Sequence, residues 1–188
     1  MPSSHEPPLF RLIAGLGNPG REYEETRHNA GFMIVDRLAQ RAGVPFRFEP
    51  KWNAAVALTG GVILCRPQGF MNTSGEPIAA VARFYKIPPA GILAIFDDVA
   101  IPLGRIRIRP GGSSGGHNGM ESILRHVGDI PRLRVGIGAA DGQPMIQHVL
   151  GKFLPGERPI LAEAVERAIQ AVDCLQSHGI DAAMNQFN

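Results

Sequence analysis

A polar segment, Thr26-Arg27-His28-Asn29, contains the first side chain that could act as a base near neutral pH. The His28 imidazole lies just before an expected helix, in a loop where a ligand can reach it. Most loop histidines take no part in chemistry, so His28 becomes a candidate general base only if an acid lies beside it. Asp97, directly after the apolar run ILAIF, would be such an acid.

Three asparagines could supply neutral hydrogen bonds to a ligand. Asn18 stands in the tight turn Asn18-Pro19-Gly20, at the carboxyl end of the first expected strand, and ligands of open α/β sheets bind at that edge. Asp97 also ends an expected strand, so polar groups could converge there. Asn72 and Asn118 each stand at the start of an expected helix, and either could instead be a helix cap.

Two alternating segments place arginines on one face of a sheet. In RIRIR, Arg105, Arg107 and Arg109 share a face while the isoleucines between them enter the core. In RLRVGIG, Arg132 and Arg134 are expected to point outward in the same way. If these strands are neighbours, their guanidinium groups form a patch suited to phosphate. A solvated sheet face, or salt bridges to Asp and Glu, is the alternative for either strand alone.

Two glycine-rich motifs resemble well-known site signatures but fit them poorly. Gly15, Gly17 and Gly20 spell G-x-G-x-x-G, yet no apolar helical stripe follows Gly20 and no acid ends a strand about 20 residues on, which disfavours a dinucleotide site. The loop GGSSGG (111–116) matches a nucleophile elbow twice, and Ser113, Asp141 and His148 would fit the order of a triad. So many glycines predict a mobile loop bordering a site instead.

The elements that must position these residues follow from apolar spacing. Strands are expected at 9–16, 53–59, 62–67, 92–96, 105–109 and 132–138, with a hairpin across Gly60-Gly61; helices are expected from about 30 to 42, at 77–85, at 118–127 and at 157–177, with a short helical end to 187. This interleaving predicts an α/β fold, with a twisted mixed β-sheet and helices on both faces. We expect residues 1–8 to form a flexible tail and residues 9–188 a single domain.

Composition narrows the classes of function. No apolar stretch approaches the roughly 20 residues of a membrane span, and the N-terminus lacks the pattern of a secretory signal, so a cytoplasmic location is expected. A net charge of +2 does not by itself indicate a polyanionic partner. The two cysteines, Cys65 and Cys174, and the remaining histidines show no metal-ligand spacing.

Five blocks, GLGNPGREYEETRHNAG, PQGFMNTSG, FDD, PGGSSGGHNG and RLRVGIG, occur in this order over most of the chain. In this respect the sequence resembles the bacterial peptidyl-tRNA hydrolases. The resemblance implies a monomeric α/β enzyme with no metal and no cofactor, which hydrolyses the ester between a peptide and the 3′ ribose of tRNA.

The resemblance also implies residue roles. His28 would be the general base, oriented by Asp97, and Asn18, grouped with the catalytic residues, would help to distinguish blocked from free aminoacyl ends. Substrate and tRNA contacts would come from Tyr23, Phe70, Asn72, Asn118, Arg109 and Arg134.

Two departures from the family pattern are Ser113-Ser114, where glycine and often histidine are usual, and Gly69, where threonine is common. They leave the proposed catalytic groups in place and affect only loop stiffness and substrate fit. An RNA-binding relative without activity is the alternative function, although a pure binder would not need the base His28.

Overall fold

The computed structural model describes residues 8–188. Of the expected N-terminal tail, residues 1–7 lie outside the described residues. The strands are β1 (Leu12–Gly15), β2 (Arg47–Glu49), β3 (Ala54–Thr59), β4 (Val62–Pro67), β5 (Ile92–Asp98), β6 (Ile106–Arg109) and β7 (Arg132–Gly136). The α-helices are α1 (Ala30–Ala42), α2 (Gly75–Phe84), α3 (Asn118–His126), α4 (Met145–Leu150) and α5 (Arg158–Phe187). Short 3-10 turns are η1 (Arg21–Tyr23), η2 (Arg27–Asn29), η3 (Met71–Thr73) and η4 (Pro89–Gly91).

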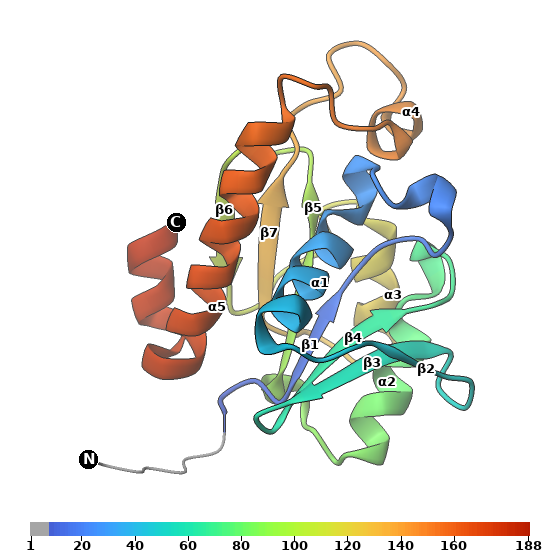
Figure 1. Ribbon diagram of the computed structural model, residues 1–188, viewed down its shortest axis with the longest axis vertical. Helices are drawn as coiled ribbons and strands as arrows, with labels where there is room; N and C mark the ends of the chain where they lie inside the picture. The colour runs from blue at the N-terminus through green and yellow to red at the C-terminus, as the bar shows by residue number, and fades with distance from the viewer. Residues whose placement is uncertain (1–7) are drawn as a thin grey trace.

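The seven strands form one mixed sheet in the order β2-β3-β4-β1-β5-β7-β6 (Figure 1). The central strands are parallel, with β1 pairing with β4 and β5, and β5 pairing with β7. The outer pairs, β2 with β3, β3 with β4, and β6 with β7, are antiparallel. The expected mixed sheet and the hairpin across Gly60-Gly61 are confirmed.

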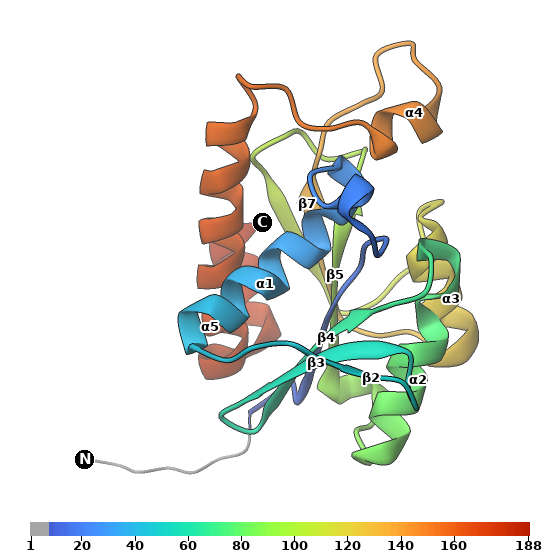
Figure 2. The ribbon, with the colours of Figure 1, turned by 45° about the vertical axis from the view of Figure 1, so that its right-hand side comes forward.

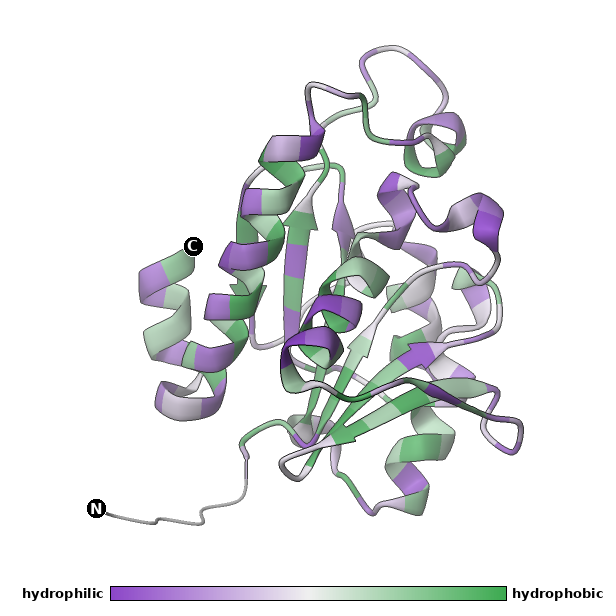
Figure 3. Ribbon diagram, viewed as in Figure 1, coloured by the Kyte–Doolittle hydropathy of each residue, from purple (hydrophilic) through white to green (hydrophobic). Residues whose placement is uncertain are grey.

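Helices cover both faces of the sheet (Figures 1 and 2). Alternate strand residues enter two separate cores because successive side chains point to opposite faces. Ile13 packs with residues of α1 and α5, whereas its neighbour Leu12 packs with residues of α2 and α3. Apolar residues accordingly concentrate on the strands and on the sheet-facing sides of the helices (Figure 3). No helix among residues 8–188 is long and apolar enough to cross a membrane.

Close packing of α1 explains Gly15, the first glycine of the G-x-G-x-x-G motif. A Cβ on Gly31, in the first turn of α1, would lie 2.2 Å from the carbonyl oxygen of Ile95 on β5. A Cβ on Gly15 would lie 2.3 Å from the carbonyl oxygen of Gly31. The helix therefore crosses β1 and β5 at backbone contact, and this places its N-terminal end directly above the carboxyl ends of those strands.

Two features differ from the sequence expectation, because the short strand β2 and the helix α4 were not predicted. The expected short helical end to 187 is present: α5 continues to Phe187 across a break at Gly179, whose φ is 85° and ψ is 177°. The break returns the chain to β6, where the side chain of Asn188 hydrogen-bonds both backbone groups of Ile108, at 2.7 and 2.9 Å.

Candidate active site

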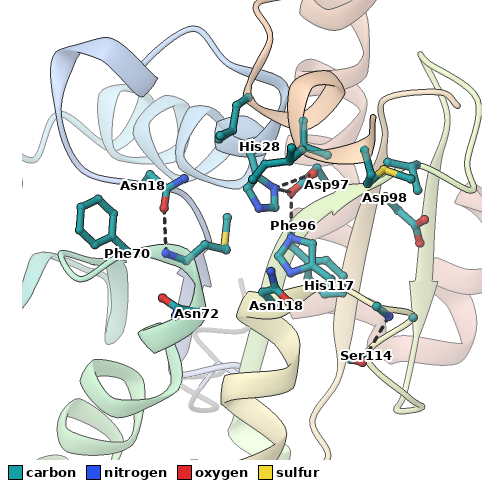
Figure 4. Close-up of a pocket in the computed structure, with 18 residues that line it drawn as sticks. Asn18, His28, Phe70, Asn72, Phe96, Asp97, Asp98, Ser114, His117 and Asn118 are labelled. Carbon is teal, nitrogen blue, oxygen red and sulfur yellow. Dashed lines mark hydrogen bonds and ion pairs between the residues drawn. The ribbon is translucent and has the colours of Figure 1, made fainter. Parts of the chain in front are cut away.

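One cavity of about 640 Å³ opens at the carboxyl ends of β1 and β5 (Figure 4). Six of the residues singled out in the sequence line it: Asn18, His28, Phe70, Asn72, Asp97 and Asn118. Asn18 lies in the turn after β1, His28 in η2 and Asp97 near the end of β5. Phe70 directly precedes η3, Asn72 lies within η3, and Asn118 begins α3. The sheet edge thus gathers side chains that are distant along the chain, as expected for an α/β fold.

His28 and Asp97 lie within hydrogen-bonding distance of each other in this cavity. The His28 Nδ1 atom lies 3.0 Å from Asp97 Oδ1 and 2.9 Å from Oδ2. The carboxyl is buried, whereas the His28 side chain keeps 12% of its surface exposed. A carboxylate at Nδ1 fixes the proton there, so the Nε2 atom of His28 is left as an acceptor.

The Asp97 carboxyl is held in its ionised form. Burial by itself raises the pKa of Asp97, but the interactions with His117 and His28 outweigh it and lower the pKa to about 2. At neutral pH the side chain is therefore a carboxylate that accepts hydrogen bonds from two imidazoles.

His117 is the residue that sequence reasoning missed. Its Nδ1 atom caps α3 by accepting from the backbone N–H groups of Gly119 and Met120, at 3.1 and 3.2 Å. The ring proton must then sit on Nε2, which lies 2.9 Å from Asp97 Oδ1. His117 therefore acts as a neutral donor that links the N-terminus of α3 to Asp97. The only signal in the sequence was its place before Asn118, at an expected helix start.

Asn18 is held in place through its backbone and through its side-chain oxygen. Its backbone N–H donates to Asn29 Oδ1 at 2.8 Å, and its carbonyl accepts from Asn29 Nδ2 at 2.9 Å. Its side-chain Oδ1 accepts from the backbone N–H of Met71 at 2.8 Å. Only the Asn18 Nδ2 group is left to face a ligand, so this residue can serve the cavity as a donor.

Neither remaining asparagine acts as a helix cap. The cap of α3 is His117, and Asn118 occupies the next position; Asn72 lies inside η3, ahead of α2. Both line the cavity opposite His28 (Figure 4). Phe70, with 62% of its surface exposed, stands at the rim.

Helix α4 covers the cavity with an apolar wall. Met145 and Ile146 line the cavity and are 51% and 67% exposed. The segment is held down by Arg27, whose Nη2 lies 3.1 Å from Glu157 Oε2 and whose Nη1 donates to the carbonyl of His148. Because Arg27 precedes His28, its hydrogen bond to His148 joins α4 to the loop that carries the imidazole.

His28, Asp97 and His117 also have the composition of a metal site. One ligand atom from each lies within 4.8 Å of the others. In the structure, however, the two nitrogens that face Asp97 are its hydrogen-bond partners, and the other nitrogen of His117 caps α3. A metal ion would have to displace both hydrogen bonds, so the present arrangement suits proton transfer better than metal binding.

Comparison with known proteins decides the family. Residues 12–188 match the model of a family described as peptidyl-tRNA hydrolase. A peptidyl-tRNA hydrolase of Akkermansia muciniphila is 49% identical over 181 residues, covering 95% of this chain and 95% of the relative. This chain belongs to the peptidyl-tRNA hydrolase family. A further member, from Synechococcus sp. (strain JA-2-3B'a(2-13)), is 47% identical over 186 residues. That alignment covers 95% of this chain and 83% of the relative.

The fold agrees with that of a solved family member. The crystal structure of peptidyl-tRNA hydrolase from Acinetobacter baumannii matches with a TM-score of 0.89 at 38% identity, covering 96% of this chain and 95% of that one. The resemblance of the five sequence blocks to the peptidyl-tRNA hydrolases is therefore confirmed.

The arginines of this chain differ in part from the expectation. Strands β6 and β7 are neighbours, with Arg107 opposite Arg134 and Arg109 opposite Arg132. The prediction that Arg132 points into solvent was wrong, because only 2% of its side chain is exposed. The loop 111–114 and Asp129 cover this position, and Arg132 donates to Asp129 at 2.5 Å and to the carbonyl of Ser113 at 2.8 Å.

Tyr23 and the residues of the triad order lie elsewhere than the sequence suggested. Tyr23, in η1, is not among the residues that line the cavity. The triad order Ser113, Asp141 and His148 is not assembled, since the buried His148 ring contacts Gln143 and the carbonyl of Gly138. The Gly-rich loop does border the site, through residues 114–116.

Proposed function

We propose that this chain hydrolyses the ester between the peptide and the 3′ ribose of peptidyl-tRNA, with water activated by His28. Its membership of the family supports the activity, and the inactive alternative has no support in the comparisons. The single observation that carries the mechanism is the His28–Asp97 pair at 2.9 Å, open to the cavity.

The proton transfers follow from the tautomer of His28. The free Nε2 atom takes a proton from water as the water oxygen attacks the ester carbonyl, and Asp97 stabilises the imidazolium that forms. The imidazolium then returns the proton to the ribose oxygen as the carbon–oxygen bond of the ester breaks. A ribose hydroxyl leaves more readily than an amine, so the reaction needs no serine or cysteine intermediate.

The asparagines would stabilise charge that develops on the carbonyl oxygen. The Nδ2 groups of Asn72 and Asn118 are neutral donors for this charge, and the loss of one such donor typically costs about 100- to 1,000-fold in rate. We assign Asn72 and Asn118 to substrate and water, and Asn18 to the blocked amino end. Its locked backbone would hold that donor in a fixed direction.

The tRNA would be held by arginine and aromatic side chains. Arg134 Nη1 lies 2.9 Å from Asp98 Oδ2, at the edge of the cavity, so Asp98 orients the guanidinium while leaving donors for a phosphate. Arg109 is exposed on the neighbouring strand. Phe70 offers a ring on which a terminal base can stack. Tyr23 would contact tRNA outside the cavity.

Because the substrate is made by ribosomes, we also propose that the enzyme works in the cytoplasm, as a monomer with an N-terminal tail and a single catalytic domain spanning residues 9–188. Size-exclusion chromatography with light scattering tests the oligomeric state.

A turnover assay with a defined peptidyl-tRNA tests the mechanism. His28→Ala should abolish peptide release and leave the affinity for tRNA nearly intact. The same assay with and without a chelator separates proton transfer from metal catalysis, and the rate should not change. Undiminished turnover by His28→Ala would refute the role of the imidazole.

A further inference from the structure

Three arginines lie on or directly before the edge strand β6, and of these only Arg109 is assigned to tRNA above. Arg105, Arg107 and Arg109 alternate along β6 and its approach, all exposed, while Ile106 and Ile108 are buried. None of these three arginines forms an ion pair with any group of residues 8–188. Three like charges on one strand face are unfavourable unless an anion meets them.

A second cavity, of about 480 Å³, adjoins these arginines. Arg105 and Arg107 line it from β6 and its approach, and Arg167 lines it from α5, which lies beside β6 (Figure 1). The remaining lining comes from the loop 100–104, Ile106 and the end of the chain, and no Asp or Glu side chain takes part. The cavity therefore presents three guanidinium groups without a carboxylate side chain to neutralise them.

Arg167 is held ready for a ligand. Its Cζ atom lies 5.1 Å from the centre of the Phe187 ring, and its Nη2 donates to the carbonyl of Phe187 at 3.4 Å. These contacts restrict the side chain while the residue stays exposed. Less conformational entropy is then lost when a ligand binds.

We propose that this second cavity binds a phosphodiester of the tRNA backbone, as a site additional to Arg109 and Arg134. The proposal rests on the proposed tRNA substrate. Guanidinium forks match phosphate oxygens, and Arg107 lies directly opposite Arg134 in the β6–β7 ladder. Arg134, which hydrogen-bonds Asp98 at the catalytic cavity, is therefore linked through Arg107 to the second cavity, which Arg167 also lines. An RNA strand that follows these arginines would enter the active site by its 3′ end.

The spacing of the arginines fits a nucleic-acid backbone. Alternate residues of a strand lie about 6.6 Å apart on one face, which is similar to the step between neighbouring phosphates. A single free phosphate would use only one of these positions, whereas a continuous strand can use several. A polynucleotide is therefore the class of ligand that the whole row favours.

The test compares binding of deacylated tRNA by the wild type and by the double variant Arg105→Gln/Arg167→Gln. If each arginine contacts a phosphate, the slope of log K against log salt should fall by about 0.7–0.9 per contact, or roughly 1.5 in total. Arg105→Lys/Arg167→Lys should keep most of the slope. The matched control is Arg37→Gln, an exposed arginine that pairs with Glu166 at 2.8 Å and does not line the second cavity. It should leave the slope unchanged.

Turnover provides the second measurement. In the glutamine double variant, kcat/KM for full-length peptidyl-tRNA should fall at least tenfold more than kcat/KM for a peptidyl ester of the CCA trinucleotide. An unchanged salt slope, or an equal loss on both substrates, would overturn the proposal. Failure of the proposed function would look different, because the wild type would then turn over neither ester, while tRNA binding could still be measured.

Discussion

Asp97→Asn is the most informative single substitution at the catalytic cavity. In the wild type, His28 Nδ1 lies about equally far from both carboxylate oxygens, at 3.0 and 2.9 Å. Because His117 Nε2–H donates to Oδ1, an asparagine keeps its oxygen at that position, and its NH₂ group replaces Oδ2 and faces the His28 Nδ1–H. The ring relieves this conflict by moving its proton to Nε2, and the nitrogen that faces the cavity then has no lone pair to accept from water.

The fall in kcat depends on the free energy needed to restore the original tautomer of His28. To act as a base in the variant, His28 must return to its original tautomer with two buried donors, its own Nδ1–H and the amide N–H, facing each other unpaired. Each unpaired buried donor costs about 1–3 kcal/mol, so the pair costs about 4 kcal/mol. At 1.36 kcal/mol for each factor of ten, kcat should fall about 1,000-fold.

The assay is single-turnover release of peptide from a defined peptidyl-tRNA, with circular dichroism as the check on folding. NMR of the His28 ring nitrogens should show the proton on Nε2 in the variant and on Nδ1 in the wild type. Asp98→Asn is the matched control, since Asp98 lies next in β5 but hydrogen-bonds Arg134 and Ala100 instead of a histidine. It should change kcat less than about threefold. A kcat for Asp97→Asn within tenfold of the wild type would refute the reasoning.

The helix cap at His117, the ionised carboxyl of Asp97 and the close packing of Gly31 can each be tested. His117→Asn should keep the cap of α3 but lose the donor to Asp97, so kcat should fall while the free energy of unfolding stays near that of the wild type. His117→Ala should also lose the cap, which lowers the free energy of unfolding by about 1 kcal/mol. Equal urea midpoints for the two variants would contradict the assigned cap. Because the pKa of Asp97 is lowered from 3.8 to about 2, it contributes about 2 kcal/mol of stability above pH 4 that is lost as pH falls towards 2. Acid titration followed by circular dichroism should show a smaller loss over this range for Asp97→Asn than for the wild type, and parallel curves would count against it. Gly31→Ala should lower the unfolding free energy by about 3 kcal/mol, since its Cβ would lie 2.2 Å from the carbonyl of Ile95; thermal unfolding within a degree or two of wild type would exclude that contact.

Much of the fold was predictable because apolar spacing is a strong signal in this chain. Helix α1 begins at Ala30 as expected, and both strands of the Gly60-Gly61 hairpin end where the turn requires. Strand β2 was missed because its three residues, around the half-exposed Phe48, carry no alternating apolar pattern. Helix α4 was missed because its six residues after Pro144 are too few to show a helical period.

The site was predictable only in part. His28 lies in a loop before a helix and Asp97 lies at the end of a strand, and both places are at the same edge of the sheet. Their contact could therefore be predicted. The role of His117 depends on which ring nitrogen caps α3, and residue order cannot supply that geometry. Arg132 was misplaced because alternation gives the face of a strand that a residue occupies, but does not tell whether a loop covers that face.

The amide of Asn188 has a consequence for how molecules of this enzyme behave towards one another. Strand β6 is the last strand of the sheet, and an unpaired outer strand is a template on which another chain can add its own strand. The side chain of Asn188 occupies the N–H and C=O of Ile108 as a neighbouring strand would, and the repulsion of the flanking arginines discourages addition further along. The break at Gly179 thus brings Asn188 to the outer side of β6, where its hydrogen bonds to Ile108 oppose edge-to-edge aggregation.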